Sequence, residues 1–458
     1  MGQRLGGIGT LVERLRKTAT GSFARGLTIL TSASLLQNLI TVAAAPVLAR
    51  LFSPEEFGIA GLIQVVAALP ILAATGQYYL AFGIARNRSE TVNIAALSLL
   101  LVALLSLAML PPVLALRAHA DLLPDFLAPL GPHLWTVPIL MALSATLSVC
   151  RVWEIRLARY RSMVSNRLIE TGCMNAVQIG LGLFGAGAIG LILGRLLAVA
   201  AAAAHGLSLM VRPLGRRGLG AVSWRRVCTV ARRHWRFPVY QLPAQSLGVV
   251  AQQLTPILLG ALYSLSSVGY FWFATRLLER PSIVFGANVG RVFYQHAADR
   301  RQAGKPVFVM FVRSTGLLLV AAIAPFAIVI AYGPPLFAFV FGAEWETAGH
   351  YARWIALANF VMLIAFPARS ATSLFGLQGQ FIVVEAVRAT TSALALVAVA
   401  LAGGDELQAI AASVALQSVI MLGFITFVAI RLRRLDRQIP ATVAVPRTPP
   451  AAEPPSDI

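Results

Sequence analysis

Charge is scarce in this chain. Only 12% of its 458 residues are Asp, Glu, Lys or Arg, whereas 58% are hydrophobic, and the mean hydropathy is +0.76. Soluble globular domains carry about twice that share of charged residues. The composition therefore indicates an all-α integral membrane protein that crosses the bilayer many times.

Acidic residues and cysteines are scarcer still. The chain has 18 acidic against 38 basic residues, which gives a formal net charge of +20. Nucleic acid is not the expected partner, because the basic residues are scattered between long apolar runs instead of forming one face of a soluble domain. The three cysteines have neither metal-ligand spacing nor an even count for disulfides. We expect plain thiols, no metal site and no cofactor.

Apolar runs of about 20 residues, the length that a helix needs to cross the hydrocarbon core, follow one another along the chain. They predict twelve spans: 27–49, 57–78, 92–116, 131–152, 166–185, 187–210, 238–262, 267–290, 308–332, 347–368, 380–401 and 407–430. Residues 1–26 precede the first run without a cleavage site, so the first span is expected to be retained. Part of this segment is either a short amphipathic helix or a solvated tail.

The loops between these spans alternate in charge. Arginines gather at the N-terminus and in every second loop, whereas the intervening loops hold mainly acidic residues such as Glu55, Asp121, Glu344 and Asp405. Because Lys and Arg concentrate in cytoplasmic loops, this alternation supports an even number of spans and predicts that both termini are cytoplasmic.

The longest basic stretch divides the spans into two halves. The predicted organisation is a cytoplasmic N-terminal segment (1–26), an N-lobe (27–210), a basic cytoplasmic linker (211–237), a C-lobe (238–430) and a disordered proline-rich tail (431–458). "FSPEEFG" at 52–58 has a weak echo in "YSLSSVG" at 263–269, and Phe82 and Phe293 keep the same offset. These echoes suggest a duplication with an axis along the membrane normal.

Three charged residues interrupt the eighth span. Arg276, Glu279 and Arg280 fall on one helical face, which must turn away from lipid. Arg276 lies near the middle of the span, and the planar fork of an arginine binds phosphate through paired hydrogen bonds. The alternative is that Glu279 neutralises one arginine and that the cluster only joins helices.

Other polar residues within the spans leave their roles open. Glu385 and Arg388 form either a structural pair or a coupling or gating element. Gln37, Asn38, Gln241, Gln245 and Gln252 fit a wet cavity wall and fit interhelical hydrogen bonds nearly as well. Glu170 and Arg167 are interpreted as an interfacial pair, and Arg195 and Arg353 also lie within spans and need partners.

Several motifs resemble those of one known family. They are "LARLFSPEEFG" (48–58), "FPVYQLPAQSL" (237–247), "VGYFWFATRLLERP" (268–281), "VGRVFYQHAA" (289–298) and "GAEWETAGHYARWIAL" (342–357). In this order they resemble the polysaccharide and O-antigen (Wzx-type) flippases of the multidrug/oligosaccharidyl-lipid/polysaccharide exporter superfamily. The resemblance extends over residues 25–435.

The resemblance implies twelve helices in two six-helix lobes around a central cavity, in the bacterial inner membrane. It implies movement of undecaprenyl-pyrophosphate-linked glycans to the outer leaflet by alternating access, without enzymatic activity. Arg276 and Arg353 match characteristic family arginines. With Arg280, Gln37, Gln245 and Gln252 they are the expected pyrophosphate and glycan contacts, whereas Glu279, Glu385 and Arg388 are the expected coupling or gating residues. Where relatives carry a charged pair, this chain has Gln77 and Tyr79, which puts a second charged contact in doubt.

The expected partners are the lipid-linked glycan and the bilayer, with glycan polymerase or export machinery as a candidate, and we expect a monomer. Proton or sodium coupling stays open. A drug or metabolite antiporter of the same superfamily is the alternative function, but it would call for an acidic cavity. A membrane glycan polymerase or ligase is a weaker alternative, because no predicted exported loop much exceeds about 15 residues.

Overall fold

The structure is a computed structural model that describes residues 22–119, 121, 123–212 and 220–438, without the side chains of 22–31, Arg280, Pro281 and Val284. Long helices occupy all twelve predicted spans. They are α2 (Ser22–Leu51), α3 (Pro54–Ala73), α4 (Arg88–Ala118), α5 (Thr136–Arg156), α6 (Tyr160–Leu183), α7 (Ala188–Val211), α10 (Leu242–Leu262), α11 (Leu265–Gln302), α12 (Phe308–Phe341), α13 with α14 (Glu346–Ile364, Phe366–Phe375), α15 (Gln378–Leu401) and α16 (Glu406–Arg437).

Local sequence determines where several helices begin. Ser53 forms a capping box with Glu56 at the start of α3, and Pro54 occupies the first turn. Asn87 caps α4 and Ser264 caps α11 in the same way, through side-chain oxygens that accept backbone N–H groups. Ser53 and Ser264 occupy equivalent places in the "FSPEEFG" and "YSLSSVG" segments, so the sequence echo marks equivalent helix starts.

Within the described residues, nine helices or joined helices are long and apolar enough to cross a membrane. The three predicted spans outside that set are α6, α10 and α11. Each carries polar or charged residues along its length, such as Glu170, Gln252 and Arg276. A helix of this composition is stable in a membrane when its polar side faces protein or water, and two of these three helices line the central cavity described below.

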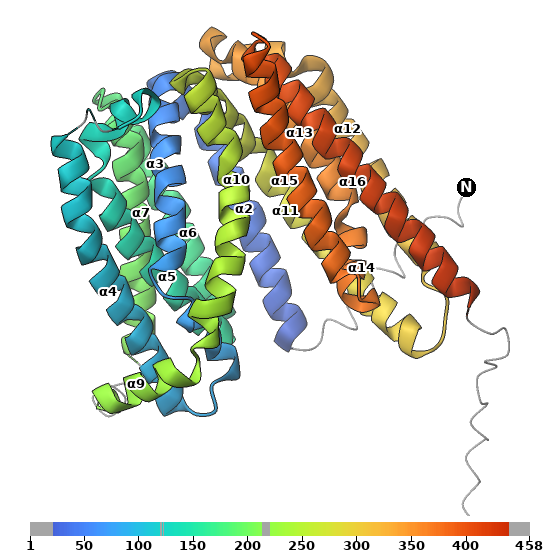
Figure 1. Ribbon diagram of the computed structural model, residues 1–458, viewed down its shortest axis with the longest axis horizontal. Coiled ribbons are helices and arrows are strands. Elements are labelled where there is room, and N and C mark those ends of the chain that lie inside the picture. Colours follow the sequence, from blue (N-terminus) through green and yellow to red (C-terminus); the bar gives the residue numbers. More distant parts are fainter. Residues whose placement is uncertain (1–21, 120, 122, 213–219, 439–458) are drawn as a thin grey trace, which may run out of the picture.

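The helices form two six-helix lobes (Figure 1). In the N-lobe, α2 packs against α6 and α5 packs against α4 and α7; in the C-lobe, α12 packs against α13 and α15 against α16. One apolar core joins the lobes, since it contains Phe57 and Leu62 together with Phe273 and Trp345. Two further cores each belong to one lobe, around Phe82 in the N-lobe and around Phe293 in the C-lobe.

The lobes meet where α3 crosses α11. A Cβ on Gly58 would overlap the carbonyl oxygen of Leu265, and a Cβ on Gly269 would overlap that of Pro54. The two contacts are equivalent under the offset between the halves, so the crossing is pseudo-symmetric. Only glycine allows the helices to approach this closely.

Aromatic side chains extend this interface. The Trp345 ring lies 4.2 Å from Phe273 and 5.2 Å from Phe57, measured between ring centroids. Its indole N–H donates a hydrogen bond of 2.8 Å to the carbonyl oxygen of Ala49 in the other lobe. Trp345 has no exposed surface, so the lobes are sealed here by a dry, hydrogen-bonded contact.

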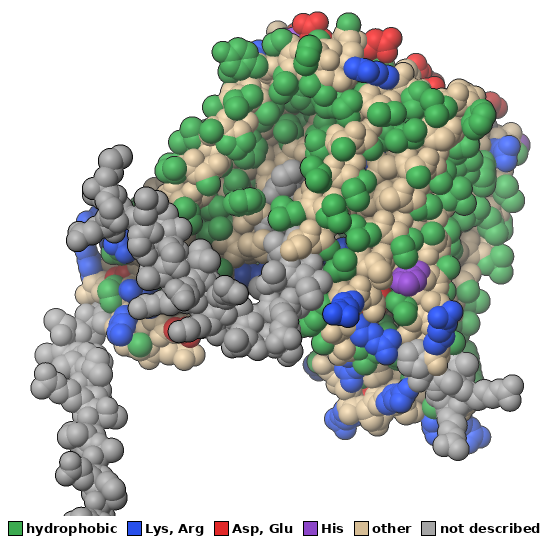
Figure 2. Space-filling view, turned by 180° about the vertical axis from the view of Figure 1, so that it is seen from behind, with side chains coloured by type: hydrophobic (Ala, Val, Ile, Leu, Met, Phe, Trp, Pro, Cys, Tyr) green, Lys and Arg blue, Asp and Glu red, His purple; other side chains and the backbone are tan. Residues whose placement is uncertain are grey.

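The two ends of the molecule differ in charge. The sealed end carries the acidic loop residues Glu55, Glu344 and Asp405 and is called the acidic end. The opposite end carries the arginine-rich loops and is called the basic end (Figure 2). At the basic end each lobe has its own core, so among the described residues the two lobes share a core at the acidic end and have separate cores at the basic end.

Two predicted boundary segments differ in detail from the structure. The linker 211–237 contains an amphipathic helix, α9 (Trp224–Arg233), whose Val227 and Val230 are buried against the N-lobe. Helix α16 continues to Arg437, seven residues beyond the predicted end of the last span. The N-terminal residues 1–21 and the proline-rich residues 439–458 lie outside the described residues.

Gly269→Val is expected to weaken the seal. Overpacking costs about 1 to 3 kcal/mol, which would shift the ratio of closed to open acidic ends by about 5- to 150-fold. Spin labels at Glu55 and Gln408, one in each lobe, should report a longer distance. Gly423→Val on α16 is the matched control, because a Cβ there meets nothing within 4 Å. An unchanged distance distribution in Gly269→Val would contradict the assignment of this crossing as the seal.

Candidate functional site

A polar cavity of about 350 Å³ lies between the lobes. Helices α2, α5, α6 and α7 of the N-lobe form most of it, and α11 closes it from the C-lobe. It is called the central cavity, and its lining is Ser34, Gln37, Asn38, Thr41, Arg151, Arg167, Glu170, Thr171, Met174, Arg195, Arg276 and Ile283. Four arginines and one glutamate give this lining a formal net charge of +3.

Glu170 connects the arginines of the N-lobe. Its carboxylate is buried and accepts a hydrogen bond of 2.8 Å from Arg195, and its other oxygen pairs with Arg151. The sequence paired Glu170 with Arg167. These two residues interact electrostatically, but the hydrogen bonds of the carboxylate come from Arg151 and Arg195, and Arg167 donates a hydrogen bond of 3.0 Å to the hydroxyl of Ser34 on α2. One carboxylate thus holds arginines from α5 and α7 against α6, and the cavity still has an excess of positive charge.

Arg276, on α11 of the C-lobe, also lines the cavity. It lies eleven residues into α11, which corresponds to about 16 Å at about 1.5 Å per residue and is close to the middle of a hydrocarbon core of about 30 Å. Its guanidinium lies 5.6 Å from the ring centroid of Trp272, one turn earlier. The predicted midspan position of Arg276 therefore coincides with a cavity that both lobes line.

Helix α2 supplies hydrogen-bonding groups that carry no charge. The side-chain amide of Gln37 donates a hydrogen bond of 2.7 Å to Thr171 on α6, and the Thr41 hydroxyl donates to the Gln37 carbonyl at 2.9 Å. With Asn38 they form a polar stripe that faces the arginines. This arrangement can bind hydroxyl-rich or anionic groups.

Arg353 occupies a different place from the one that the sequence suggested. Its guanidinium donates to the carbonyl oxygens of Ile330 at 2.6 Å and Ala331 at 3.2 Å. In a regular helix these carbonyls would accept the N–H groups of residues 334 and 335, which are both prolines and have none. Arg353 therefore bonds two carbonyl oxygens that the prolines leave without a helical N–H donor, and it is not in the lining of the central cavity. A role in substrate binding stays a prediction.

Most of the other predicted site residues lie outside the central cavity or cannot be placed in it. Among residues whose side chains the structure describes, Gln245, Gln252 and Glu279 are not in the lining of the central cavity; Gln252 and Glu279 are exposed on α10 and α11. The side chain of Arg280 lies outside the described residues. Of the predicted substrate contacts, the structure thus brings together Arg276 and Gln37.

Glu385 and Arg388 lie on α15, within the C-lobe, and Arg388 contacts α16. Arg388 donates to the Glu385 carboxylate at 2.7 and 3.0 Å and to the Gln417 side-chain oxygen at 2.6 Å. The side-chain N–H groups of Gln417 donate hydrogen bonds to the hydroxyls of Ser392 and Ser413. The pair therefore belongs to a polar network inside one lobe, and a coupling role for it stays a prediction.

Gln77, at which the resemblance put a second charged contact in doubt, closes a turn. It is fully buried in the left-handed region, with φ of 59°, and its side-chain amide donates a hydrogen bond of 2.7 Å to the Leu72 carbonyl. The turn after α3 is thus stabilised from within the N-lobe.

The sequence reasoning missed Arg151, Arg167 and Glu170 as cavity residues because it placed them in or near a basic loop. A signal was present, since residues 160–183 include two arginines, Glu170 and several amides. So polar a span requires a polar surface to face. Arg195 was recognised as an intramembrane charge, but its partner Glu170 was not.

Arg353→Leu should lower the free energy of unfolding by about 1.5 to 3 kcal/mol, the range for hydrogen bonds to a charged group, and leave binding of inorganic pyrophosphate unchanged. Adding Pro334→Ala and Pro335→Ala should restore much of the stability, because both N–H donors return. Thermal unfolding of the detergent-solubilised chain measures this. A stable single variant that loses pyrophosphate binding would return Arg353 to the list of ligand contacts.

The fold resembles that of known membrane transporters. Among solved structures, an inward-facing multidrug resistance MATE family transporter of the MOP superfamily aligns with a TM-score of 0.57 at 13% identity, over 90% of this chain and 99% of that chain. The lipid II flippase MurJ in an inward closed conformation aligns with a TM-score of 0.56 at 11% identity, over 90% of each chain. No curated protein sequence gives a significant match.

At these identities the likeness shows the fold alone. The family comparison is independent of it: residues 47–349 match the family described as "Polysaccharide biosynthesis protein", which confirms the resemblance found in the sequence motifs. The chain belongs to this family of polysaccharide biosynthesis proteins and has the fold shared by MATE transporters and MurJ.

Proposed function

We propose that this protein is a flippase that moves pyrophosphate-linked polyprenyl glycans across the bacterial inner membrane by alternating access. The observation that carries this proposal is the central cavity, which has a net charge of +3 and draws arginines from both lobes. Intramembrane charge of one sign is costly unless a ligand or pathway uses it.

A pyrophosphate suits this cavity for chemical reasons. Arginine keeps its charge at any accessible pH and binds phosphate oxygens through two parallel N–H donors. Glu170 compensates part of the charge of Arg151 and Arg195, so excess positive charge is left for an anion. The polar stripe of Gln37, Asn38 and Thr41 offers donors and acceptors to the first sugars of a glycan.

The state of the lobes fits loading from the cytoplasm. Arginine-rich loops mark the cytoplasmic side, so we assign the basic end, with both termini, to the cytoplasm. Among the described residues, the lobes have separate cores towards that end and share a core at the acidic end. In this orientation the cavity accepts substrate made in the cytoplasm, and the α3–α11 seal must open to release it outside.

The related proteins favour lipid-linked glycan over other cargo. The family is described as one of polysaccharide biosynthesis, and one structure of the same fold is a lipid II flippase. Another structure of this fold is a multidrug resistance transporter, so an antiporter is the second candidate. The positive cavity disfavours cationic drugs, and an anionic metabolite is the cargo that this alternative would require.

Arg276→Lys should fail nearly as badly as Arg276→Ala if the guanidinium binds pyrophosphate through its fork. Lysine keeps the charge but loses the paired bonds, worth about 1.5 to 3 kcal/mol and thus roughly 10- to 150-fold in affinity. The measurement is surface glycan in a strain lacking the gene, with membrane levels of each variant determined. Arg291→Ala, an exposed arginine on the same helix, is the matched control and should be active.

The alternative role of Arg276 gives the opposite pattern. If it only balances Glu279, the lysine variant should work, and Arg276→Ala with Glu279→Ala should recover the activity that Arg276→Ala loses. Full activity of the lysine variant, or rescue by the double change, would refute the pyrophosphate assignment.

The orientation has its own test. After replacement of Cys150, Cys173 and Cys228, a cysteine at Arg301 should react with an impermeant thiol reagent only from the cytoplasmic side, and a cysteine at Glu346 only from outside. Both residues are exposed. Labelling of both from the same side would contradict the assigned topology.

A further inference from the structure

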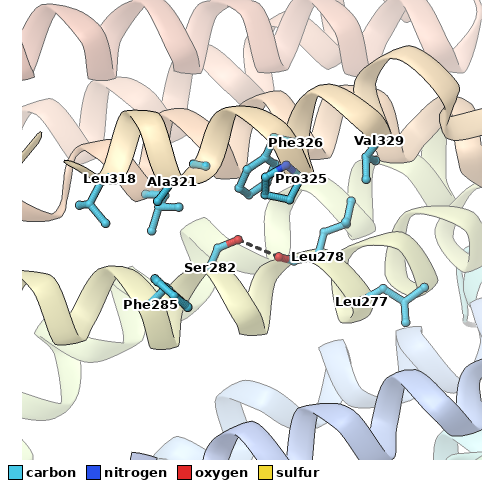
Figure 3. A pocket seen from close by; sticks show the side chains of 11 residues that line it. Leu277, Leu278, Ser282, Phe285, Leu318, Ala321, Pro325, Phe326 and Val329 are labelled. Carbon is cyan, nitrogen blue, oxygen red and sulfur yellow. Dashed lines mark hydrogen bonds between the residues drawn. The ribbon is translucent and has the colours of Figure 1, made fainter. Parts of the chain in front are cut away.

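A second cavity, of about 260 Å³, lies between α11 and α12 in the C-lobe (Figure 3), and Leu363 of α13 also lines it. It is called the apolar pocket. Leu278 and Phe285 of α11 and Leu318, Ala321 and Phe326 of α12 are among the side chains that line it. Ser282 is the single hydroxyl-bearing residue in this lining, and its hydroxyl donates to the Leu278 carbonyl of its own helix at 2.9 Å.

The described side chains of the pocket therefore offer a ligand little besides hydrocarbon. Sites for compact small molecules combine an apolar lining with a few polar groups that fix orientation, and they measure about 300 to 1,000 Å³. This pocket is smaller, and its one hydroxyl is already bonded. Phe285 is 58% exposed and Ala321 is also exposed, so the pocket is open at the surface and suits a segment of a long hydrocarbon chain.

One helix separates the apolar pocket from the central cavity. Arg276 and Ile283 of α11 line the central cavity, whereas Leu278, Ser282 and Phe285 line the apolar pocket. At about 100° per residue the latter three point about 120° to 180° away from Arg276. Leu277 and Leu278, the two residues that follow Arg276, both belong to the apolar pocket, so the anion site and the hydrocarbon site adjoin along the same helix.

We propose that the apolar pocket binds the polyprenyl chain of the substrate next to its pyrophosphate, with α11 between the two parts. This inference rests on the proposed function. The chain is covalently attached to the anion at Arg276, so its effective concentration near the pocket is high. The acyl chains of a bilayer phospholipid have similar chemistry, but its phosphodiester carries one negative charge and fewer acceptor oxygens than a diphosphate, so the arginines bind it less strongly. The pocket thereby selects a lipid-linked anion over a free one.

The test compares ligands with and without the chain on the purified full-length protein in lipid nanodiscs. Ala321→Trp fills the pocket, and Ala324→Trp, an exposed position on the same helix outside the lining, is the matched control. Ala321→Trp should weaken binding of a long-chain polyprenyl diphosphate about tenfold or more, as expected when several methylene groups lose burial. Inorganic pyrophosphate should bind it as it binds the unmodified protein.

The outcomes separate the two proposals. Unchanged binding of the polyprenyl diphosphate to Ala321→Trp would overturn the pocket assignment and leave the proposed function intact. If inorganic pyrophosphate does not bind the unmodified protein, or binds Arg276→Ala equally well, the proposed function fails and the pocket assignment fails with it.

A second measurement does not depend on the folding of the tryptophan variant. A photoreactive phenylalanine analogue at Phe285 should crosslink to polyprenyl diphosphate, and the same analogue at Val320, an exposed residue of α12 outside the pocket, should not. Crosslinking at Phe285 to phospholipid alone, with saturating polyprenyl diphosphate present, would show that an acyl chain occupies the pocket and would overturn the proposal.

Discussion

The close crossing of α3 and α11 is the contact on which the arrangement of the lobes depends. Gly58 and Gly269 let the two backbones meet at the acidic end, and this approach allows Trp345 to reach the Ala49 carbonyl across the interface. The shared core forms there, whereas each lobe keeps a separate core at the basic end. The central cavity lies between two lobes that share a core at one end. Rotation about such a contact is a common way to alternate access to a site.

The charges of the cavity are consistent with a site that is completed by its ligand. Arg151 and Arg195 converge on Glu170 within the N-lobe, and Arg276 approaches from the other lobe. On the proposed function, a pyrophosphate would bridge arginines of both lobes and lower the electrostatic cost of holding them together. A ligand shifts a conformational equilibrium only through such differential contacts. Helix α6, the most polar long helix of the N-lobe, would thus contact the substrate through the residues that it contributes to the cavity.

Much of the fold could be predicted, because every span is marked by an apolar run and by the charge of the loops at its two ends. The twelve helices lie where the apolar runs predicted them, and the weak echo between the halves marks the pseudo-symmetric crossing of Gly58 and Gly269. The site was less predictable, because it depends on which helices face each other. Arg276 and Gln37 were identified from their own spans, but the partners of Glu170 come from α5 and α7. The hydrogen bonds by which Arg353 compensates for Pro334 and Pro335 could not be predicted either, because they depend on how α12 and α13 pack side by side.

The central claim is that one anionic group is held between the lobes by arginines of both. The most direct test is an electron cryomicroscopy structure of the full-length protein in nanodiscs with a polyprenyl diphosphate bound. The account predicts phosphate density in the central cavity, within hydrogen-bonding distance of Arg276 and of at least one of Arg151, Arg167 and Arg195. Diphosphate density elsewhere on the protein, or bound by arginines of a single lobe, would contradict it.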